Sequence, residues 1–251
     1  MAEATPWDLT VDLSGRVALV TGAARRLGRA LALDLASAGA DVAVHCRSSR
    51  DEAEEVARAI RAMGRRSVVV ACDLVQPDET TAAFARAHDA LGRLDVLVNN
   101  VGTIVWKRFD ELTPEDWRAC LDGTLLATLH ASRAALPFMR AEGYGRIVNI
   151  LDADADASTP VPFATAYKLG KRATHQLTRT MAAGEAGHGI TVNAVSPGTL
   201  EDSPTKPPLE RIPAGRFGTY RDVAQAVRYL ASESAGYVTG AHLKVSGGYL
   251  V

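Results

Sequence analysis

The chain has 251 residues, of which 47% are hydrophobic and 23% charged, which is the composition of an ordinary packed globular protein. Lys and Arg number 28 and Asp and Glu 29, so the formal net charge of −1 argues against broad nucleic-acid binding. The three cysteines (Cys46, Cys72 and Cys120) show no CxxC spacing, and no signal peptide or long apolar run occurs. We therefore expect a cytoplasmic protein with reduced thiols, no metal and no membrane partner.

Short β-branched runs alternate with longer alanine-rich stretches along the whole chain. A buried strand is predicted at 16–21, followed by a helix at 25–38 that Gly39 ends. The long helix predicted from residue 115 contains Pro137, which we expect to kink or end it. The remaining predicted strands are 41–46, 66–71, 94–99, 146–151, 190–195 and 242–245, and the remaining helices are 51–63, 78–91, 115–140, 163–183 and 220–231.

Unbroken apolar strands that alternate with helices are typical of a parallel sheet covered on both faces. We predict an α/β fold, a single doubly wound (Rossmann) domain over residues 1–251 with a parallel seven-stranded sheet. Residues 1–12 would form an N-terminal extension. The proline-rich stretch 199–213 would form a substrate lid loop, because long loops inside compact domains are usually functional or disordered.

The first predicted strand runs into a glycine turn at the start of a helix. Such a turn lets the backbone approach a pyrophosphate, and the helix N-terminus attracts its charge. Glycine turns before helices also occur without any nucleotide. The residues expected to bind the phosphates here are Gly22, Arg25, Arg26, Leu27 and Gly28, with Gly28 allowing close packing at the helix start.

The end of the second predicted strand favours NADP(H) over NAD(H). It is followed by Arg47, Ser48 and Ser49, at the point that faces the adenosine ribose in nucleotide-binding folds of this topology. An acidic residue would bind the 2′-hydroxyl there, whereas arginine suits a 2′-phosphate; the alternative is a solvated basic turn. After the third strand, Asp73 beside Leu74 could accept a bond from the adenine amino group or cap a helix.

Four segments in order resemble the short-chain dehydrogenase/reductase family over about residues 13–250. They are the glycine turn at 21–28, the NNVG segment at 99–102, the YxxxK pair Tyr167 and Lys171, and the NAVSPG segment at 193–198. The four-residue spacing puts Tyr167 and Lys171 on one face of a helix. The resemblance implies that Tyr167 donates a proton to the atom bonded to the reacting carbon. It also implies that Lys171 binds the nicotinamide ribose and lowers the pKa of Tyr167.

The resemblance implies further contacts and an assembly. The C-terminal SGGY segment at 246–249 is similar to one that lies at a subunit contact in the family, which implies a homotetramer. The residues implied to line the adenine ribose and nicotinamide are Asn99, Val101 and Gly102, and those implied to shape the carboxamide pocket are Pro197, Gly198 and Thr199.

Three positions depart from the family pattern. Arg26 replaces the middle glycine of the turn, as in the pteridine reductase branch, and we expect it to reach the cofactor phosphates. The family's catalytic serine becomes an aspartate, which pteridine reductases also carry. Counting forward from Asn149 selects Asp152 as the catalytic residue, whereas counting back from Tyr167 selects Asp154, which is otherwise a substrate contact or a solvated acid.

The third departure and two aromatic residues concern the substrate. Thr124 aligns with the helix asparagine that usually completes the proton relay, and it can hold a water less firmly. Trp106 and Phe109 follow the NNVG segment, where one could stack on a flat ring or, as a loop aromatic, anchor the helix. The pattern predicts an NADPH-dependent reductase of a C=O or C=N group, and the pteridine reductase features favour a pterin-like ring. The alternatives are a reductase of 3-oxoacyl thioesters or other carbonyls, and a cofactor-binding protein that has lost turnover.

Overall fold

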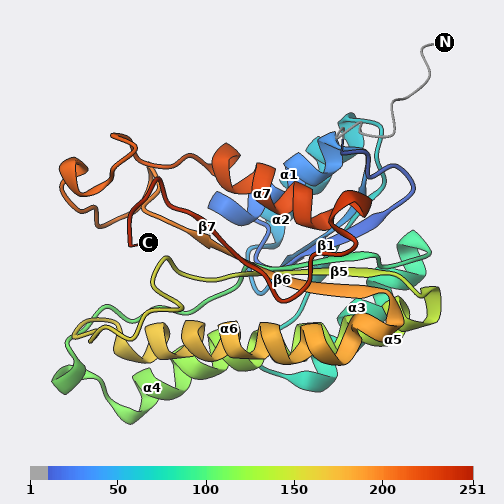
Figure 1. The fold of residues 1–251 in the computed structure, drawn as a ribbon. Helices are drawn as coiled ribbons and strands as arrows, with labels where there is room; N and C mark the ends of the chain where they lie inside the picture. The colour runs from blue at the N-terminus through green and yellow to red at the C-terminus, as the bar shows by residue number, and fades with distance from the viewer. Residues whose placement is uncertain (1–10, 251) are drawn as a thin grey trace.

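A computed structural model describes residues 11–250, so residues 1–10 of the expected N-terminal extension lie outside the described residues. Seven parallel strands form one sheet in the order β3-β2-β1-β4-β5-β6-β7 (Figure 1). The predicted doubly wound α/β fold is confirmed. The strands are β1 (Val17–Val20), β2 (Asp41–Cys46), β3 (Ser67–Ala71), β4 (Val96–Asn99), β5 (Gly145–Ile150), β6 (Ile190–Pro197) and β7 (His242–Val245).

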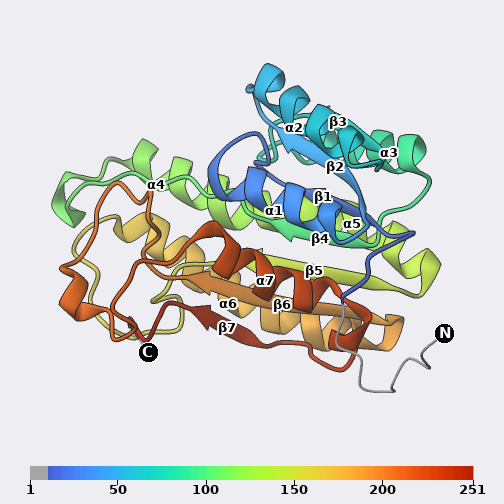
Figure 2. The same cartoon turned by 90° about the horizontal axis from the view of Figure 1, so that it is seen from above.

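Helices cover both faces of the sheet. Figures 1 and 2 show α1, α2 and α7 on one face and α3, α5 and α6 on the other. Strand β1 pairs with both β2 and β4, so the winding reverses there, and sheets of this type bind ligands at the carboxyl ends of the strands beside such a point. The helices are α1 (Arg26–Ser37), α2 (Arg50–Ala62), α3 (Pro77–Leu91), α4 (Pro114–Leu121), α5 (Ala127–Glu142), α6 (Thr165–Glu185) and α7 (Tyr220–Ala231).

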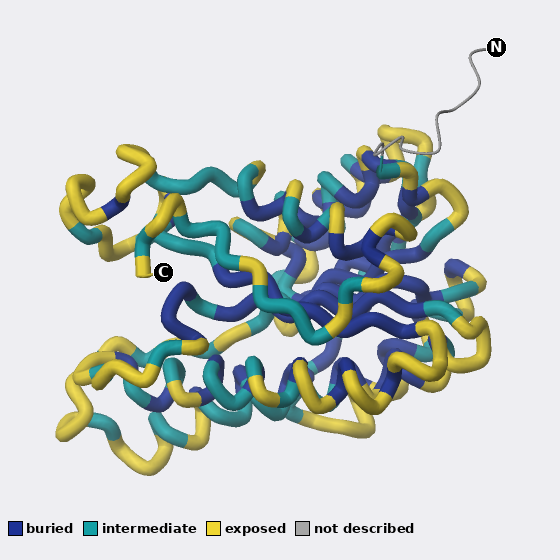
Figure 3. Tube along the Cα trace, in the orientation of Figure 1, coloured by how far each residue is buried: buried dark blue, intermediate teal, exposed yellow. Residues whose placement is uncertain are grey.

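The core has one layer on each side of the sheet, because successive strand residues face opposite ways. In β1, Ala18 and Val20 pack on the side of α1 and α7, while Val17 and Leu19 pack on the side of α3 and α5. The central strands β1, β4 and β5 are buried throughout, whereas the edge strands β3 and β7 are partly exposed (Figure 3). This core holds the carboxyl ends of the central strands in place.

The expectation that Pro137 ends a helix is wrong, whereas a kink there stays a prediction. Helix α5 runs through Pro137 to Glu142 and is capped by Gly143, whose φ is +60°. The predicted helix is instead interrupted earlier, by a π-helical turn at Asp122–Leu126 between α4 and α5. A Cβ on Gly123 would lie 2.1 Å from Thr103 Oγ1, so the loop after β4 presses against this turn. Tertiary contact with that loop, not proline, accompanies the break.

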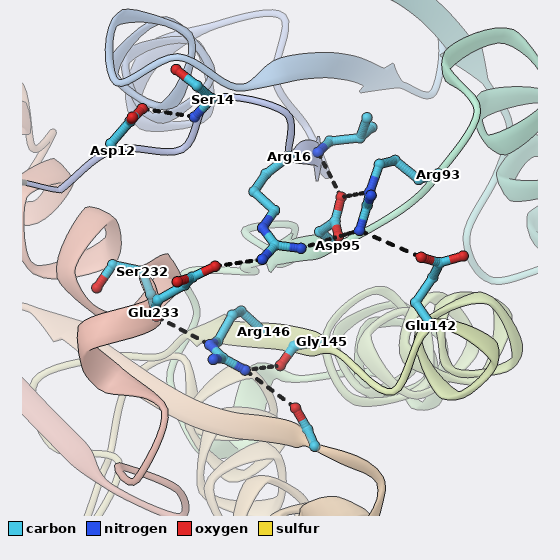
Figure 4. A network of polar contacts seen from close by, with 12 residues as sticks. Asp12, Ser14, Arg16, Arg93, Asp95, Glu142, Gly145, Arg146, Ser232 and Glu233 are labelled. Atoms are coloured by element: carbon cyan, nitrogen blue, oxygen red, sulfur yellow. Dashed lines mark hydrogen bonds and ion pairs between the residues drawn. The ribbon is translucent and has the colours of Figure 1, made fainter.

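A network of charged side chains lies at the opposite, amino ends of the central strands (Figure 4). Asp95, just before β4, is completely buried and accepts hydrogen bonds from Val17 N at 2.8 Å and Arg93 Nε at 2.7 Å. Arg16, just before β1, also pairs with this carboxylate at 3.3 Å. Since these partners balance the buried charge of Asp95, the network stabilises the amino ends of the strands. The carboxyl ends are the place for a functional site.

Candidate active site

The turn between β1 and α1 has the backbone that a phosphate-binding turn requires. Gly22 has φ +62°, and a Cβ on Gly28 would lie 2.2 Å from Gly22 O, so the close packing expected at Gly28 is present. Arg26 has φ +51°, a left-handed conformation that favours glycine, which explains why the usual residue at this position is glycine. Asn100 Nδ2 donates to Thr21 O at 3.0 Å and ties the turn to β4.

A cavity of about 340 Å³ opens beside this turn, at the carboxyl ends of β1 to β4. It brings together five of the residues predicted to hold the adenosine half of a cofactor, while Ser48 and Ser49 lie outside its lining at the start of α2. The lining that the sequence predicted comprises Gly22, Arg47, Asp73, Leu74 and Val101.

The donors and charges in this cavity suit a nucleotide. The exposed Arg47 guanidinium offers a planar phosphate-binding group at the ribose position. Asp73 Oδ1 accepts a hydrogen bond from Val75 N at 3.1 Å, so its carboxylate caps the local turn and still borders the cavity. The glycine backbone at Gly22 lets a ligand approach closely. These features fit the phosphate and adenosine parts of a dinucleotide.

His45 is a cavity residue that sequence reasoning missed. Gly22 N donates to His45 Nδ1 at 3.1 Å, and His45 Nε2 lies 3.2 Å from Cys72 O, to which it can donate. Burial lowers the pKa of His45 to about 4, so the ring is neutral and matches this donor and acceptor pattern. One imidazole thus joins the carboxyl ends of β1, β2 and β3. The only sequence signal for a role of His45 at the cavity was its position near the end of a predicted buried strand.

The two arginines of the turn have carboxylate partners. Arg25 pairs with Glu52 of α2. Arg26 Nε donates to Asp202 Oδ2 at 2.9 Å, and Tyr220 Oη also donates to that carboxylate. Asp202 belongs to the stretch 199–213, so Arg26 joins the turn to the segment expected to be a lid. A contact of Arg26 with a cofactor phosphate stays a prediction, and it would require Arg26 to leave Asp202.

The catalytic pair predicted from YxxxK lies together outside the cavity lining, against Gly102, whose neighbours Val101 and Thr103 line the cavity. Lys171 is buried, its Nζ donates to Ile150 O at 2.6 Å, and Nζ lies 5.7 Å from the centre of the Tyr167 ring. A Cβ on Gly102 would lie 3.2 Å from Lys171 Nζ and 3.3 Å from Tyr167 Cε2. The glycine of the NNVG segment therefore makes room for both side chains.

The ionisation of this pair differs from the expectation. Burial raises the pKa of Tyr167, and the charges of Asp152 and Asp154 raise it further. Burial also lowers the pKa of Lys171 to about 8, although the Asp152 charge opposes this. The pKa of Tyr167 is raised and not lowered as expected, and Lys171 is not among the groups that shift it in this structure. Tyr167 is thus held as a neutral phenol, which is the form that donates a proton.

Both candidate aspartates follow β5 and both contact Lys168, a residue without a predicted role. Lys168 Nζ lies 2.6 Å from Asp152 Oδ2 and 3.0 Å from Asp154 Oδ1. Asp154 is buried, and Asp152 is partly buried. The assignment of the serine position to Asp152 stays a prediction. Two aspartates close in sequence and a lysine directly after Tyr167 were the only sequence signals for this contact.

The side chains of two predicted site residues make hydrogen bonds within the protein. Asn99 Nδ2 donates to Asn149 Oδ1 at 2.8 Å and to Ser132 Oγ at 3.0 Å, so its side chain joins strands in the core. Thr124 is fully buried in the π-helical turn, where its Oγ1 accepts from Thr103 N at 3.2 Å. Any contact of Asn99 with a cofactor would therefore have to come from its backbone. The hydroxyl of Thr124 is engaged in closing the loop after β4.

The loop after β4 exposes its aromatic residues. Trp106 and Phe109 are 55% and 61% exposed, and the Trp106 ring stacks on Phe163 with centroids 6.3 Å apart. Phe109 N donates to Pro162 O at 2.9 Å, which pairs this loop with the segment before α6. The ring of Trp106 thus anchors the loop, whereas Phe109 contributes a backbone hydrogen bond. Stacking on a substrate ring stays a prediction.

The residues expected to shape the carboxamide pocket lie at the end of β6. Gly198 N donates to Val245 O at 2.9 Å, and a Cβ on Gly198 would lie 2.7 Å from Ser246 Cα. Thr199 O accepts from Gly218 N at 3.0 Å. Pro197 ends the strand. The backbone here passes so close to the C-terminal segment that only glycine fits at 198.

Two kinds of feature are absent from residues 11–250. No helix in that range has the length and hydropathy to cross a bilayer. No group of three or more His, Cys, Asp or Glu side chains in the same range could hold a metal ion.

Comparisons with known proteins agree with this geometry. Residues 22–250 match the family model described as Enoyl-(Acyl carrier protein) reductase. The "Uncharacterized oxidoreductase YohF" of Escherichia coli K12 is 36% identical over 248 residues, 94% of this chain and 96% of that protein. The 3-oxoacyl-[acyl-carrier-protein] reductase FabG of Staphylococcus aureus Mu50 is 35% identical over 239 residues, 92% of this chain and 96% of that protein. A gluconate 5-dehydrogenase from Burkholderia cenocepacia J2315, solved with NADP and tartrate, superposes with a TM-score of 0.89 and 31% identity, covering 95% and 96% of the two chains.

Proposed function

The chain belongs to the short-chain dehydrogenase/reductase family of oxidoreductases, and we propose that it is an NADPH-dependent reductase of a C=O or C=N group. The observation that carries this proposal is the packing of Tyr167 and Lys171 on Gly102, whose neighbours Val101 and Thr103 line the same cavity as Arg47. A neutral phenol, a buried ammonium and a phosphate-binding guanidinium are the groups such a reduction needs.

The preference for NADPH rests on the ribose end of the cavity. Arg47 stands where an acidic residue would bind an unmodified 2′-hydroxyl, and its guanidinium suits a 2′-phosphate. The likeness to a gluconate 5-dehydrogenase solved with NADP supports the same cofactor. Gly22, Asp73 and Val101 would hold the remaining adenosine half, and Pro197 to Thr199 the nicotinamide end.

The chain's own residues would then manage the proton. When bound, the nicotinamide cofactor supplies the hydride that the reacting carbon accepts. Tyr167 Oη donates its proton to the oxygen or nitrogen of the same double bond, so that C=O becomes CH–OH or C=N becomes CH–NH. The protonated Lys171 stabilises the phenolate left on Tyr167, which is reprotonated from water. Asp152 positions the substrate beside this acid.

We propose a pterin-like heteroaromatic ring as the first substrate class. Arg26 at the middle-glycine position and an aspartate at the serine position are shared with the pteridine reductase branch, and exposed Trp106 or Phe109 could cover a flat ring. The family resemblance supports a homotetramer, and we propose that the protein is cytoplasmic.

A 3-oxoacyl thioester is the second candidate, because FabG of S. aureus is 35% identical over 92% of this chain. The two candidates are separated by measuring NADPH oxidation with a dihydropterin and with an acetoacetyl thioester. Turnover of the dihydropterin supports the first substrate class, and turnover of the thioester alone supports the second. If the protein binds NADPH but does not oxidise it with the dihydropterin, the thioester or other ketones, the proposed activity is contradicted. That result would support a protein that only binds the cofactor.

A further inference from the structure

Lys168 lies next to the acid Tyr167 in sequence and contacts both carboxylates of the loop after β5. We propose that Lys168 is a positioning residue that holds Asp152 and Asp154 together as ionised carboxylates beside Tyr167. The substrate would then meet a hydrogen-bond acceptor where the family's serine offers a hydroxyl donor. The proposal rests on the reductase function given above, and it names the kind of substrate that this site takes.

The loop is folded so that the two carboxylates share one cation. Ala155 N donates to Asp152 O at 3.0 Å and Ala157 N donates to Asp154 O at 3.0 Å, which makes two successive turns. Asp152 Oδ1 also accepts from Ala153 N at 2.9 Å, leaving Oδ2 to the ammonium. The side chains of Lys168, Asp152 and Asp154 are only 17%, 24% and 11% exposed, so water screens these ion pairs weakly.

Lys168 offsets the mutual repulsion of two carboxylates, because Asp152 and Asp154 both lie within ion-pair distance of its ammonium. Like charges held near each other in a poorly solvated site repel, and a shared cation reduces this repulsion. Burial lowers the pKa of Lys168, but the two carboxylates outweigh burial and raise it overall, so the ammonium persists. Lys168 balances one of the two negative charges. The charge of Asp152 acts on both members of the catalytic pair, because it raises the pKa of Tyr167 and that of Lys171.

This charge state selects a substrate. An ionised carboxylate accepts hydrogen bonds and repels a developing oxyanion, so it favours a molecule with an N–H or O–H donor next to the reducible carbon. A dihydropterin presents such donors on its ring. An acetoacetyl thioester has none at its keto carbon, and a site built to bond a donor rejects substrates that lack it.

The first test measures the charges without any substrate. We would titrate the aspartate carboxyls of the NADPH-bound protein by 13C NMR, with Asp152→Asn and Asp154→Asn for assignment. Lys168→Met should let one of these carboxyls take up a proton at least about one pH unit higher than in the native protein. Lys168→Arg should restore the native titration. Lys244→Met is the matched control, because Lys244 pairs with Asp156 of the same loop at 2.9 Å, away from Tyr167.

The second test measures selectivity as the ratio of kcat/KM for a dihydropterin to that for an acetoacetyl thioester. Lys168→Met should lower this ratio about tenfold or more and make it pH-dependent, while Lys168→Arg and Lys244→Met keep it. An unchanged carboxyl titration in Lys168→Met, or an equal effect of Lys244→Met, would overturn the positioning role. Native turnover of the thioester alone would overturn the substrate class. If neither substrate supports NADPH oxidation but the carboxyl titration behaves as expected, the result counts against the reductase function. The role of Lys168 would then still hold.

Discussion

Gly28 gives the sharpest test of the phosphate turn, because another helical glycine provides its control. In Gly28→Ala the new Cβ would lie 2.2 Å from Gly22 O and 2.7 Å from Asn100 Nδ2, so backbone must move. Overpacking of this kind costs about 1–3 kcal/mol, and the better helix propensity of alanine returns about 0.5–1 kcal/mol. We expect a net loss of about 1–2 kcal/mol, which lowers Tm by about 2–8 °C for a chain of this size.

Gly184 lies in α6 without a positive φ, and a Cβ added there would meet nothing within 4 Å, so Gly184→Ala should raise Tm by about 1–4 °C. Thermal unfolding and NADPH titration by fluorescence would be run on both variants. Gly28→Ala should also weaken NADPH binding about tenfold or more, because Gly22 and Gly28 shape the same turn, whereas Gly184→Ala should leave it unchanged. A Gly28→Ala protein with native stability and native affinity would refute the reasoning.

Three further predictions concern charge. Arg47→Ala should weaken NADPH binding about 10- to 100-fold and NADH binding little, with exposed Arg58→Ala as control; equal losses for both cofactors would refute the 2′-phosphate assignment. Asp202→Asn should tighten NADPH binding about 2- to 5-fold in a titration, because it frees Arg26 from an exposed ion pair, and weaker binding would contradict this. The kcat/KM for reduction should fall as pH rises through about 8, where buried Lys171 loses its proton; Lys171→Arg should move that fall to higher pH, and an identical profile would exclude Lys171 as its cause.

The fold could be predicted from the chain because strand and helix periodicities are local. Six or more alternations of buried strand and amphipathic helix leave little choice but a parallel sheet, and the observed strand order agrees. Gly22, Arg47 and Asp73 were predicted correctly as cavity residues for the same reason, since each lies within two residues of the end of a predicted strand. The break at Asp122–Leu126 was not predicted, because it accompanies the packing of Thr103, on the distant loop after β4, against Gly123.

The parts of the site that sequence reasoning missed depend on distant contacts. Arg26 meets Asp202, a partner 176 residues away, and no local pattern contains that pair. Lys168 bonds carboxylates fourteen and sixteen residues earlier only because two tight turns fold the loop onto α6. The raised pKa of Tyr167 follows from burial together with these carboxylates. Motif spacing predicts the reacting groups, whereas their charge state depends on the folded loop.

The most direct measurement follows the label from NADPH deuterated at the transferred C4 position. The proposed function predicts that the native protein transfers deuterium to the carbon of the reduced C=O or C=N group. Tyr167→Phe should slow this transfer by about 10²- to 10⁴-fold and leave the Kd for NADPH nearly unchanged. Transfer at the native rate by Tyr167→Phe, or product without deuterium on carbon, would contradict the proposed reduction.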